Sequence, residues 1–283
     1  MPKLGVHVFA LAPSWDLETF RREAPRLREN GVGLIEIPLL RPAEIDAAAT
    51  RAFAEEHGLE LVGSLGLPDR LDSIADPDPA LAFLEEAMDA VASFGGTALS
   101  GVTYGTIGRT TKVARTPAEW DAMVRFVGRA ADAAEARGLR FGIEPCNRYE
   151  THLLNTAADG AALCEAVGAR NLFVHLDTYH MNVEEASFAE GFADAGGHLG
   201  YVHLSEANRG VPGRGMIDWD AAFAGLAAVG YDGPMALESM NHVDPDIAAG
   251  LAVWRPVAAD PAHVVDEGLP FLRAAAARAG LSL

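Results

Sequence analysis

Short apolar runs rich in Val, Ile and Leu alternate along this chain with longer, Ala-rich amphipathic stretches. A run of about four to eight apolar residues is typical of a buried strand, and an amphipathic stretch of about ten or more is typical of a surface helix. The runs do not alternate strictly with polar residues, as expected for a parallel sheet covered by helices. Eight such runs begin near Lys3, Val32, Leu59, Gly96, Leu139, Leu172, Gly200 and Pro234.

The spacing of these runs predicts a closed barrel. From residue 3 to residue 234 the intervals average about 33 residues, enough for one strand, one helix and two short loops. Helix boundary signals agree, because Thr116-Pro117-Ala118-Glu119 matches a capping box and Gly138 follows where a C-terminal cap belongs. Eight units favour a single (β/α)8 TIM-barrel domain over residues 1–283 rather than a doubly wound sheet.

Charge and composition exclude several classes of protein. The 283 residues include 22 Lys and Arg against 40 Asp and Glu, a net charge of −18, whereas binding to nucleic acid needs a basic surplus. No apolar stretch approaches the ~18 residues of a membrane span. Cys146 and Cys164 lack the pattern of a disulfide framework or a zinc motif. We expect a cytoplasmic protein with reduced, buried thiols, without a secretory signal, and without nucleic-acid or membrane partners.

Four consecutive predicted strands, the fifth to the eighth, end in residues that bind metals. These are Glu144, Asp177, His203 and Glu238. In a TIM barrel the carboxyl ends of the strands form the active-site face, so the four side chains are expected to lie together there. Each follows an apolar run, where an ionised group is costly without a cation or a partner. Three carboxylates and one imidazole suit Mn²⁺, Mg²⁺ or Co²⁺ better than a thiolate-bound structural zinc.

Further polar residues lie in the loops that follow these strands. Glu150, His180 and Arg209 would cover the metal, although Glu150 and Arg209 could instead form a solvated ion pair at the rim. Arg209 is expected to be exposed and not to touch the ion. His152 is expected only to line its loop, and His175 to point into the barrel one layer below Asp177.

Two weaker signals lie nearby. The Gly-rich segment 209–215 could bind a phosphate through backbone N–H groups, although such a segment is more often a tight turn. Four large side chains could line a pocket or pack in the core or rim, namely Phe9, Leu11, Tyr104 and Trp254.

The polar residues above belong to segments with a specific spacing. These segments are Glu144-Pro145-Cys146-Asn147-Arg148-Tyr149-Glu150, Leu176-Asp177-Thr178-Tyr179-His180, His203-Leu204-Ser205-Glu206-Ala207-Asn208-Arg209 and Leu237-Glu238. They resemble the ketose 3-epimerases of the D-tagatose and D-psicose (allulose) type, within the xylose isomerase-like superfamily of sugar isomerases and epimerases. The resemblance covers about residues 142–238, and the N-terminal half is similar mainly in layout.

The resemblance implies a site and a reaction. Glu144, Asp177, His203 and Glu238 would hold one divalent ion, Mn²⁺ with Co²⁺ or Mg²⁺ as alternatives, and Glu150, His180 and Arg209 would bind a small sugar. Removing the C3 proton of a ketose gives an enediolate, whose charge a divalent cation stabilises. With Glu144 and Glu238 as acid and base on opposite faces, a proton taken from one face and returned to the other inverts C3. A homodimer or homotetramer is expected.

Other functions remain open at this point. An aldose-ketose isomerase of the hydroxypyruvate isomerase type and a metal-dependent polyol dehydratase could use the same ligands. The multi-metal DNA-repair endonucleases of this fold need a basic surface, which the charge of −18 disfavours. A non-catalytic sugar-binding protein has no need of two metal-bound carboxylates on opposite sides of a ligand. The size, series and phosphorylation of the sugar are not fixed by the sequence.

Overall fold

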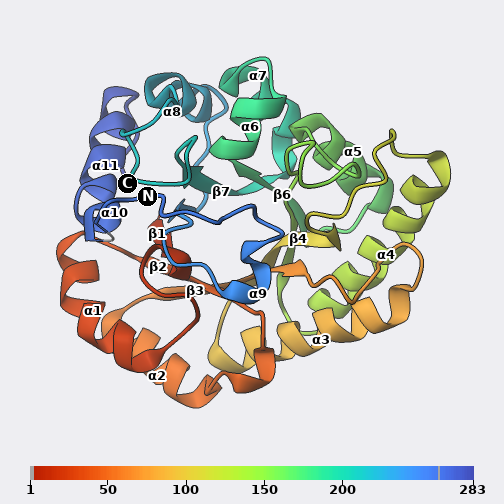
Figure 1. Ribbon diagram of the computed structural model, residues 1–283, viewed down its shortest axis with the longest axis horizontal. Helices are drawn as coiled ribbons and strands as arrows, with labels where there is room; N and C mark the ends of the chain where they lie inside the picture. Colours follow the sequence, from red (N-terminus) through yellow and green to blue (C-terminus); the bar gives the residue numbers. More distant parts are fainter. Residues whose placement is uncertain (1–2, 261) are drawn as a thin grey trace.

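The computed structural model describes residues 3–260 and 262–283 (Figure 1). Within this part of the chain, parallel strands pair in the order β1 to β8, and β8 pairs with β1 to close the barrel. Helices surround the barrel, as Figure 1 shows. The predicted (β/α)8 TIM barrel is therefore confirmed.

Each strand begins within two residues of its predicted position. Glu144 comes directly after its strand, whereas Asp177 and Glu238 are the last residues of theirs. The strands are β1 Leu4–His7, β2 Leu34–Pro38, β3 Glu60–Leu67, β4 Ala98–Thr106, β5 Arg140–Ile143, β6 Leu172–Asp177, β7 Leu199–Ser205 and β8 Met235–Glu238.

The helices follow the predicted alternation with a few additions. The capping box of α4 is present, with Thr116 and Glu119 bonded reciprocally. Two helices follow β6 and three follow β8, of which α9 lies near the barrel mouth in Figure 1. The helices are α1 Leu17–Glu29, α2 Ala47–His57, α3 Pro77–Phe94, α4 Pro117–Glu135, α5 Ala157–Val167, α6 Thr178–Glu184, α7 Phe188–Ala195, α8 Trp219–Ala228, α9 Pro245–Ala248, α10 Ala262–Asp266 and α11 Gly268–Arg278, with 3-10 turns at Val8–Ala10, Pro42–Glu44 and Gly196–His198.

The barrel interior changes from apolar to polar along the strands. One buried apolar cluster consists of Leu34, Val62, Ala98, Phe173, Tyr201 and Ala236. Two positions further along each of these strands stands a polar residue, which faces the same side because side chains alternate in a strand. With one residue each from β1 and from the end of β5, these side chains form what we call the polar layer: His7, Glu36, Ser64, Ser100, Glu144, His175, His203 and Glu238.

Glycine makes room for this layer at one position on β5. A Cβ atom on Gly142 would lie 2.1 Å from Oγ of Ser100 and 2.6 Å from the ring of Phe173. Ser100 lies 3.0 Å from Nδ1 of His175, so a side chain at position 142 would displace this buried contact.

Both cysteines are buried and free, as expected. Burial raises the pKa of the Cys164 thiol to about 12, so it is a poor nucleophile. None of the described helices combines the length and apolar character that crossing a bilayer requires.

Candidate active site

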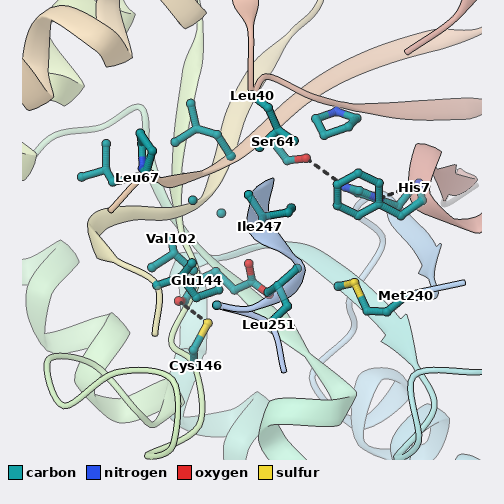
Figure 2. A pocket seen from close by; sticks show the side chains of 18 of the residues that line it. His7, Leu40, Ser64, Leu67, Val102, Glu144, Cys146, Met240, Ile247 and Leu251 are labelled. Carbon is teal, nitrogen blue, oxygen red and sulfur yellow. Dashed lines mark hydrogen bonds between the residues drawn. The ribbon is translucent and has the colours of Figure 1, made fainter. Parts of the chain in front are cut away.

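A cavity of about 330 Å³ opens at the carboxyl ends of the strands, the face on which barrel enzymes carry their active sites. The polar layer contributes six residues to its lining: His7, Glu36, Ser64, Glu144, His203 and Glu238. The cavity also has apolar lining, and Figure 2 shows Ile247 and Leu251 of the segment after β8 among the side chains around it. The pocket therefore combines ionisable groups with side chains that exclude water.

Three of the four expected metal ligands form one compact group, Asp177, His203 and Glu238. Glu144 joins this group through His203, whose Nδ1 lies 3.7 Å from Glu144 Oε1 and 3.5 Å from Glu238 Oε2. This Nδ1 is buried and has no hydrogen-bond partner. An unpaired nitrogen facing two carboxylates is the arrangement expected where a cation is to be held.

Arg209 departs from its expected position. Its side chain is only 11% exposed, and Nη1 lies 2.7 Å from Asp177 Oδ2 and 2.6 Å from Glu238 Oε2. The guanidinium also stacks 4.1 Å from the ring centre of Tyr179. The expectation of an exposed loop residue is therefore wrong, because the charge of two buried carboxylates draws the guanidinium inward.

The strand ends hold the carboxylates in place through short local contacts. Asp177 caps α6 by accepting a hydrogen bond from the backbone N–H of Tyr179 at 2.8 Å. Oγ of Ser205 lies 3.2 Å from both Asp177 and Glu238. Burial raises the pKa of Asp177 to about 6, although Arg209 acts in the opposite direction. Asp177 is thus the carboxylate of this pair that protonates more readily.

Neighbouring histidines and Arg209 act on the pKa values of the other two carboxylates. Burial would raise the pKa of Glu144 and of Glu238, but His175 and His203 lower that of Glu144, and His203 and Arg209 lower that of Glu238. Both glutamates are consequently ionised, as a base or a metal ligand requires.

Asn147 fixes the orientation of His180. The Asn147 backbone N–H donates to Nδ1 of His180 at 3.1 Å, and the Asn147 amide lies 2.9 Å from the same atom. Because Nδ1 accepts, Nε2 carries the proton, and it lies 3.8 Å from Glu144 Oε1 at the cavity. His180 can therefore donate a hydrogen bond to a ligand oxygen. No local pattern in the sequence indicates this role of Asn147.

Glu150 lies next to this pair. Its Oε1 accepts a hydrogen bond from the Asn147 side chain at 2.8 Å, and its Oε2 is buried without a partner. Among the described residues, the cavity lining includes His180 and Arg209 but not Glu150. Contact between Glu150 and a sugar would therefore need a rearrangement of this loop.

The Gly-rich segment is built around a carboxylate of the protein itself. Glu206 is fully buried and accepts hydrogen bonds from the backbone N–H groups of Ala207, Gly213 and Ile217 and from Nε1 of Trp219, each at 2.9 Å. These donors are not free to bind a phosphate. The segment is a structured turn organised by Glu206, a role that no local pattern in the sequence indicates.

Of the other residues singled out from the sequence, some line the cavity and others lie outside it. Phe9 lines the cavity, whereas Trp254 is 80% exposed. Tyr104 is buried, and its hydroxyl donates to the backbone oxygen of Glu144 at 3.0 Å. His152 contacts Glu119 of α4 at 3.1 Å. His175 is buried with Nδ1 3.8 Å from Glu144, and together with Glu144 and His203 it forms a second group that could hold a metal ion.

Comparisons with known proteins indicate the family of this chain. The family model "Xylose isomerase-like TIM barrel" matches residues 25–275. A ketose 3-epimerase from Arthrobacter globiformis is 36% identical over 278 residues, which is 96% of each chain. An L-ribulose 3-epimerase from Methylomonas sp. is 35% identical, covering 95% of this chain and 96% of the relative. The crystal structure of a Methylomonas D-allulose 3-epimerase with D-allulose gives a TM-score of 0.90 at 34% identity, over 96% of both chains.

The chain forms a closed barrel with acidic residues and histidines at its mouth, and it belongs to the xylose isomerase-like TIM-barrel family. Within this family the chain groups with the ketose 3-epimerases, which are isomerases.

Proposed function

We propose that this protein epimerises a free ketose at C3 through an enediolate, with the help of one divalent metal ion. One observation carries the proposal: Glu144 after β5 and Glu238 at the end of β8 face the same unpaired nitrogen of His203 in the cavity. Two ionised carboxylates from separate strands around one cation site provide what a two-base reaction needs. The names of the relatives support the same reaction.

Glu144, Asp177, His203 and Glu238 are the residues that would hold the ion. Three carboxylates and one imidazole form a mostly hard donor set that suits Mn²⁺, with Co²⁺ or Mg²⁺ as alternatives. Arg209 supports this assignment, because it already brings a positive charge between Asp177 and Glu238. When bound, the ion would supply Lewis-acid stabilisation for the negative charge of the enediolate.

The two glutamates carry the proton transfers. The ionised carboxylate facing C3 accepts the C3 proton, and the electron pair of the broken C–H bond enters the enediolate. The other glutamate, which takes up a proton from solvent before this step, returns that proton to C3 from the opposite face. C3 is then inverted, and exchange with solvent restores the starting protonation states. Glu144 and Glu238 exchange these roles according to which epimer is bound.

His180 and Arg209 are the proposed contacts to the sugar oxygens. His180 presents Nε2–H at the cavity, because Asn147 occupies its Nδ1. Arg209 reaches the cavity from the loop after β7 and can donate to a sugar once it leaves the carboxylates. Glu150 is the third proposed contact and would act after a local rearrangement.

One observation favours a free sugar over a phosphorylated one. Within the Gly-rich segment 209–215, the backbone N–H of Gly213 donates to the Glu206 carboxylate, and the backbone N–H groups of Arg209, Gly210 and Arg214 donate to other protein oxygens. These groups are therefore not free to bind a phosphate. The cavity lining itself combines apolar side chains, of which Figure 2 shows Leu67, Val102 and Ile247, with the side chains of Arg41, Arg70 and Arg209.

The deciding experiment follows hydrogen at C3. The Mn²⁺-loaded protein is incubated in D₂O with a panel of free ketopentoses and ketohexoses of both series, and the products are identified by NMR and chromatography. The expected product is a ketose inverted at C3 that carries deuterium there. An aldose would instead identify an aldose-ketose isomerase, loss of water a dehydratase, and binding without turnover a sugar-binding protein.

A further inference from the structure

Glu36 is a carboxylate in the middle of an otherwise apolar strand, and its side chain is 0% exposed. Burying an ionised group costs several kcal/mol unless it is well paired. The interiors of TIM barrels are usually filled by branched apolar residues, which would pack this position at no such cost. Packing alone therefore does not account for a glutamate here.

The hydrogen bonds of Glu36 reach across the barrel to β7. Its Oε2 accepts from the Tyr201 hydroxyl at 2.6 Å and from Nε2 of His203 at 2.6 Å. Its Oε1 has no hydrogen-bond partner, and Nε2 of His7 lies 3.8 Å away while contacting Ser64. Glu36 is thus directed mainly at two residues of β7, of which His203 faces the proposed metal site.

The contact with His203 determines which ring nitrogen faces the cavity. An ionised carboxylate only accepts hydrogen bonds, so Nε2 of His203 must carry a proton. The other nitrogen, Nδ1, is then the atom directed at Glu144 and Glu238. Metal-binding histidines commonly donate their second N–H to a carboxylate in this way, and loss of that partner weakens metal binding or activity by about 10–100-fold.

We propose that Glu36 is a positioning residue for the metal site, holding the imidazole of His203 in the tautomer and orientation that present Nδ1 to Glu144 and Glu238. The inference rests on the proposed function, because it assumes that these residues bind a divalent ion. Tyr201 has a lesser role: its hydroxyl donates to the same oxygen of Glu36 and restrains the carboxylate, and its ring packs edge-on against that of His203 with 5.5 Å between ring centres, a contact that phenylalanine would keep.

The first test compares metal affinity in two matched variants. The dissociation constant for Mn²⁺ is measured from the electron paramagnetic resonance signal of the free ion, with folding checked by circular dichroism and thermal unfolding. Glu36→Gln is expected to weaken Mn²⁺ binding by about 10–100-fold. Tyr201→Phe removes a buried hydrogen bond to the same oxygen but leaves the Glu36–His203 contact, so it should change affinity by less than about threefold. Equal Mn²⁺ affinity in wild type and folded Glu36→Gln would overturn the proposal.

The second test needs no variant of Glu36. The protein is labelled with ¹⁵N-histidine and loaded with diamagnetic Mg²⁺, and the His203 signals are assigned by comparison with His203→Asn. The ring is expected to carry its proton on Nε2, and a proton on Nδ1 would overturn the proposal even if Glu36→Gln did not fold. Wild-type protein that binds neither Mn²⁺ nor Mg²⁺ would count against the proposed function as well. Normal metal binding that does not depend on Glu36 would count against this inference alone.

Discussion

Nη1 of Arg209 lies 2.6 Å from Oε2 of Glu238, and it lies almost as close to Asp177. A side chain expected to contact sugar thus neutralises two proposed metal ligands. Charge-assisted hydrogen bonds of this kind are strong, so an ion that binds both carboxylates has to displace the guanidinium. Displacement frees Arg209 to donate to a sugar, and metal binding would then prepare the sugar site.

Arg209→Ala should therefore bind Mn²⁺ more tightly than wild type when no sugar is present, because the competing cation is gone. We expect about a tenfold lower dissociation constant, equivalent to about 1.4 kcal/mol, together with a raised KM for the ketose. Titration calorimetry and initial-rate kinetics measure the two effects. Arg129→Ala serves as the control. Arg129 lies on α4 and its exposed side chain pairs with Asp78, so this substitution should change neither the dissociation constant for Mn²⁺ nor the KM for the ketose. Weaker Mn²⁺ binding in Arg209→Ala would contradict the competition.

Removal of metal should abolish activity. After treatment with a chelator, Mn²⁺ or Co²⁺ is expected to restore turnover better than Ca²⁺, because Ca²⁺ prefers six to eight oxygen ligands at longer distances than this four-residue site offers. Turnover is measured for the chelated protein and after each ion is added back, with metal content determined in parallel. Full turnover in a sample shown to be free of metal would reject the requirement.

The capping box of α4 gives a prediction about stability and pH. Glu119 accepts from the backbone N–H of Thr116 at 2.7 Å and contacts His152 in the loop after β5. The Thr116 and His152 hydrogen bonds lower the pKa of Glu119 from 4.5 to about 2. Because the folded-state pKa is depressed, this carboxylate stabilises the fold above about pH 4.5 and the stabilisation is lost as the pH falls toward 2.

Glu119→Gln should therefore lower the free energy of unfolding by about 1 kcal/mol at neutral pH, and the difference from wild type should shrink as the pH falls below about 4. Urea unfolding at several pH values measures this difference. Glu86→Gln, on the exposed side of α3, is the control and should stay close to wild type throughout. A difference that does not change with pH would show that the ionised form of Glu119 has no special role.

The barrel and the residues at its mouth could be predicted because both depend on local patterns. Strands repeat at a regular interval, and Glu144, Asp177, His203 and Glu238 each stand where an apolar run ends. Closure of the barrel places the carboxyl ends of all strands on one face, so these four side chains are expected to lie together there.

Residues whose role depends on distant partners could not be predicted in the same way. Glu36 meets His203 across 167 positions of sequence, and Asn147 meets His180 across 33. For Arg209 the loop position indicates exposure, whereas the charge of the neighbouring carboxylates draws the side chain inward. A single acidic residue within an apolar strand, as at Glu36, was the one local signal that could have been used.

The most demanding prediction concerns Glu144 and Glu238, which we assign both to the ion and to proton transfer. Glu→Gln keeps the size of the side chain and one oxygen donor but removes the titratable group, so each variant should retain some metal and lose nearly all epimerisation. If each glutamate serves one face of the sugar, Glu144→Gln should still exchange the C3 proton of one epimer with solvent deuterium, and Glu238→Gln that of the other. The measurement is NMR of C3 exchange for both epimers in both metal-loaded variants. Equal exchange from both epimers in either variant would mean that one residue reaches both faces, because a carboxylate confined to one side can abstract only the proton that points toward it.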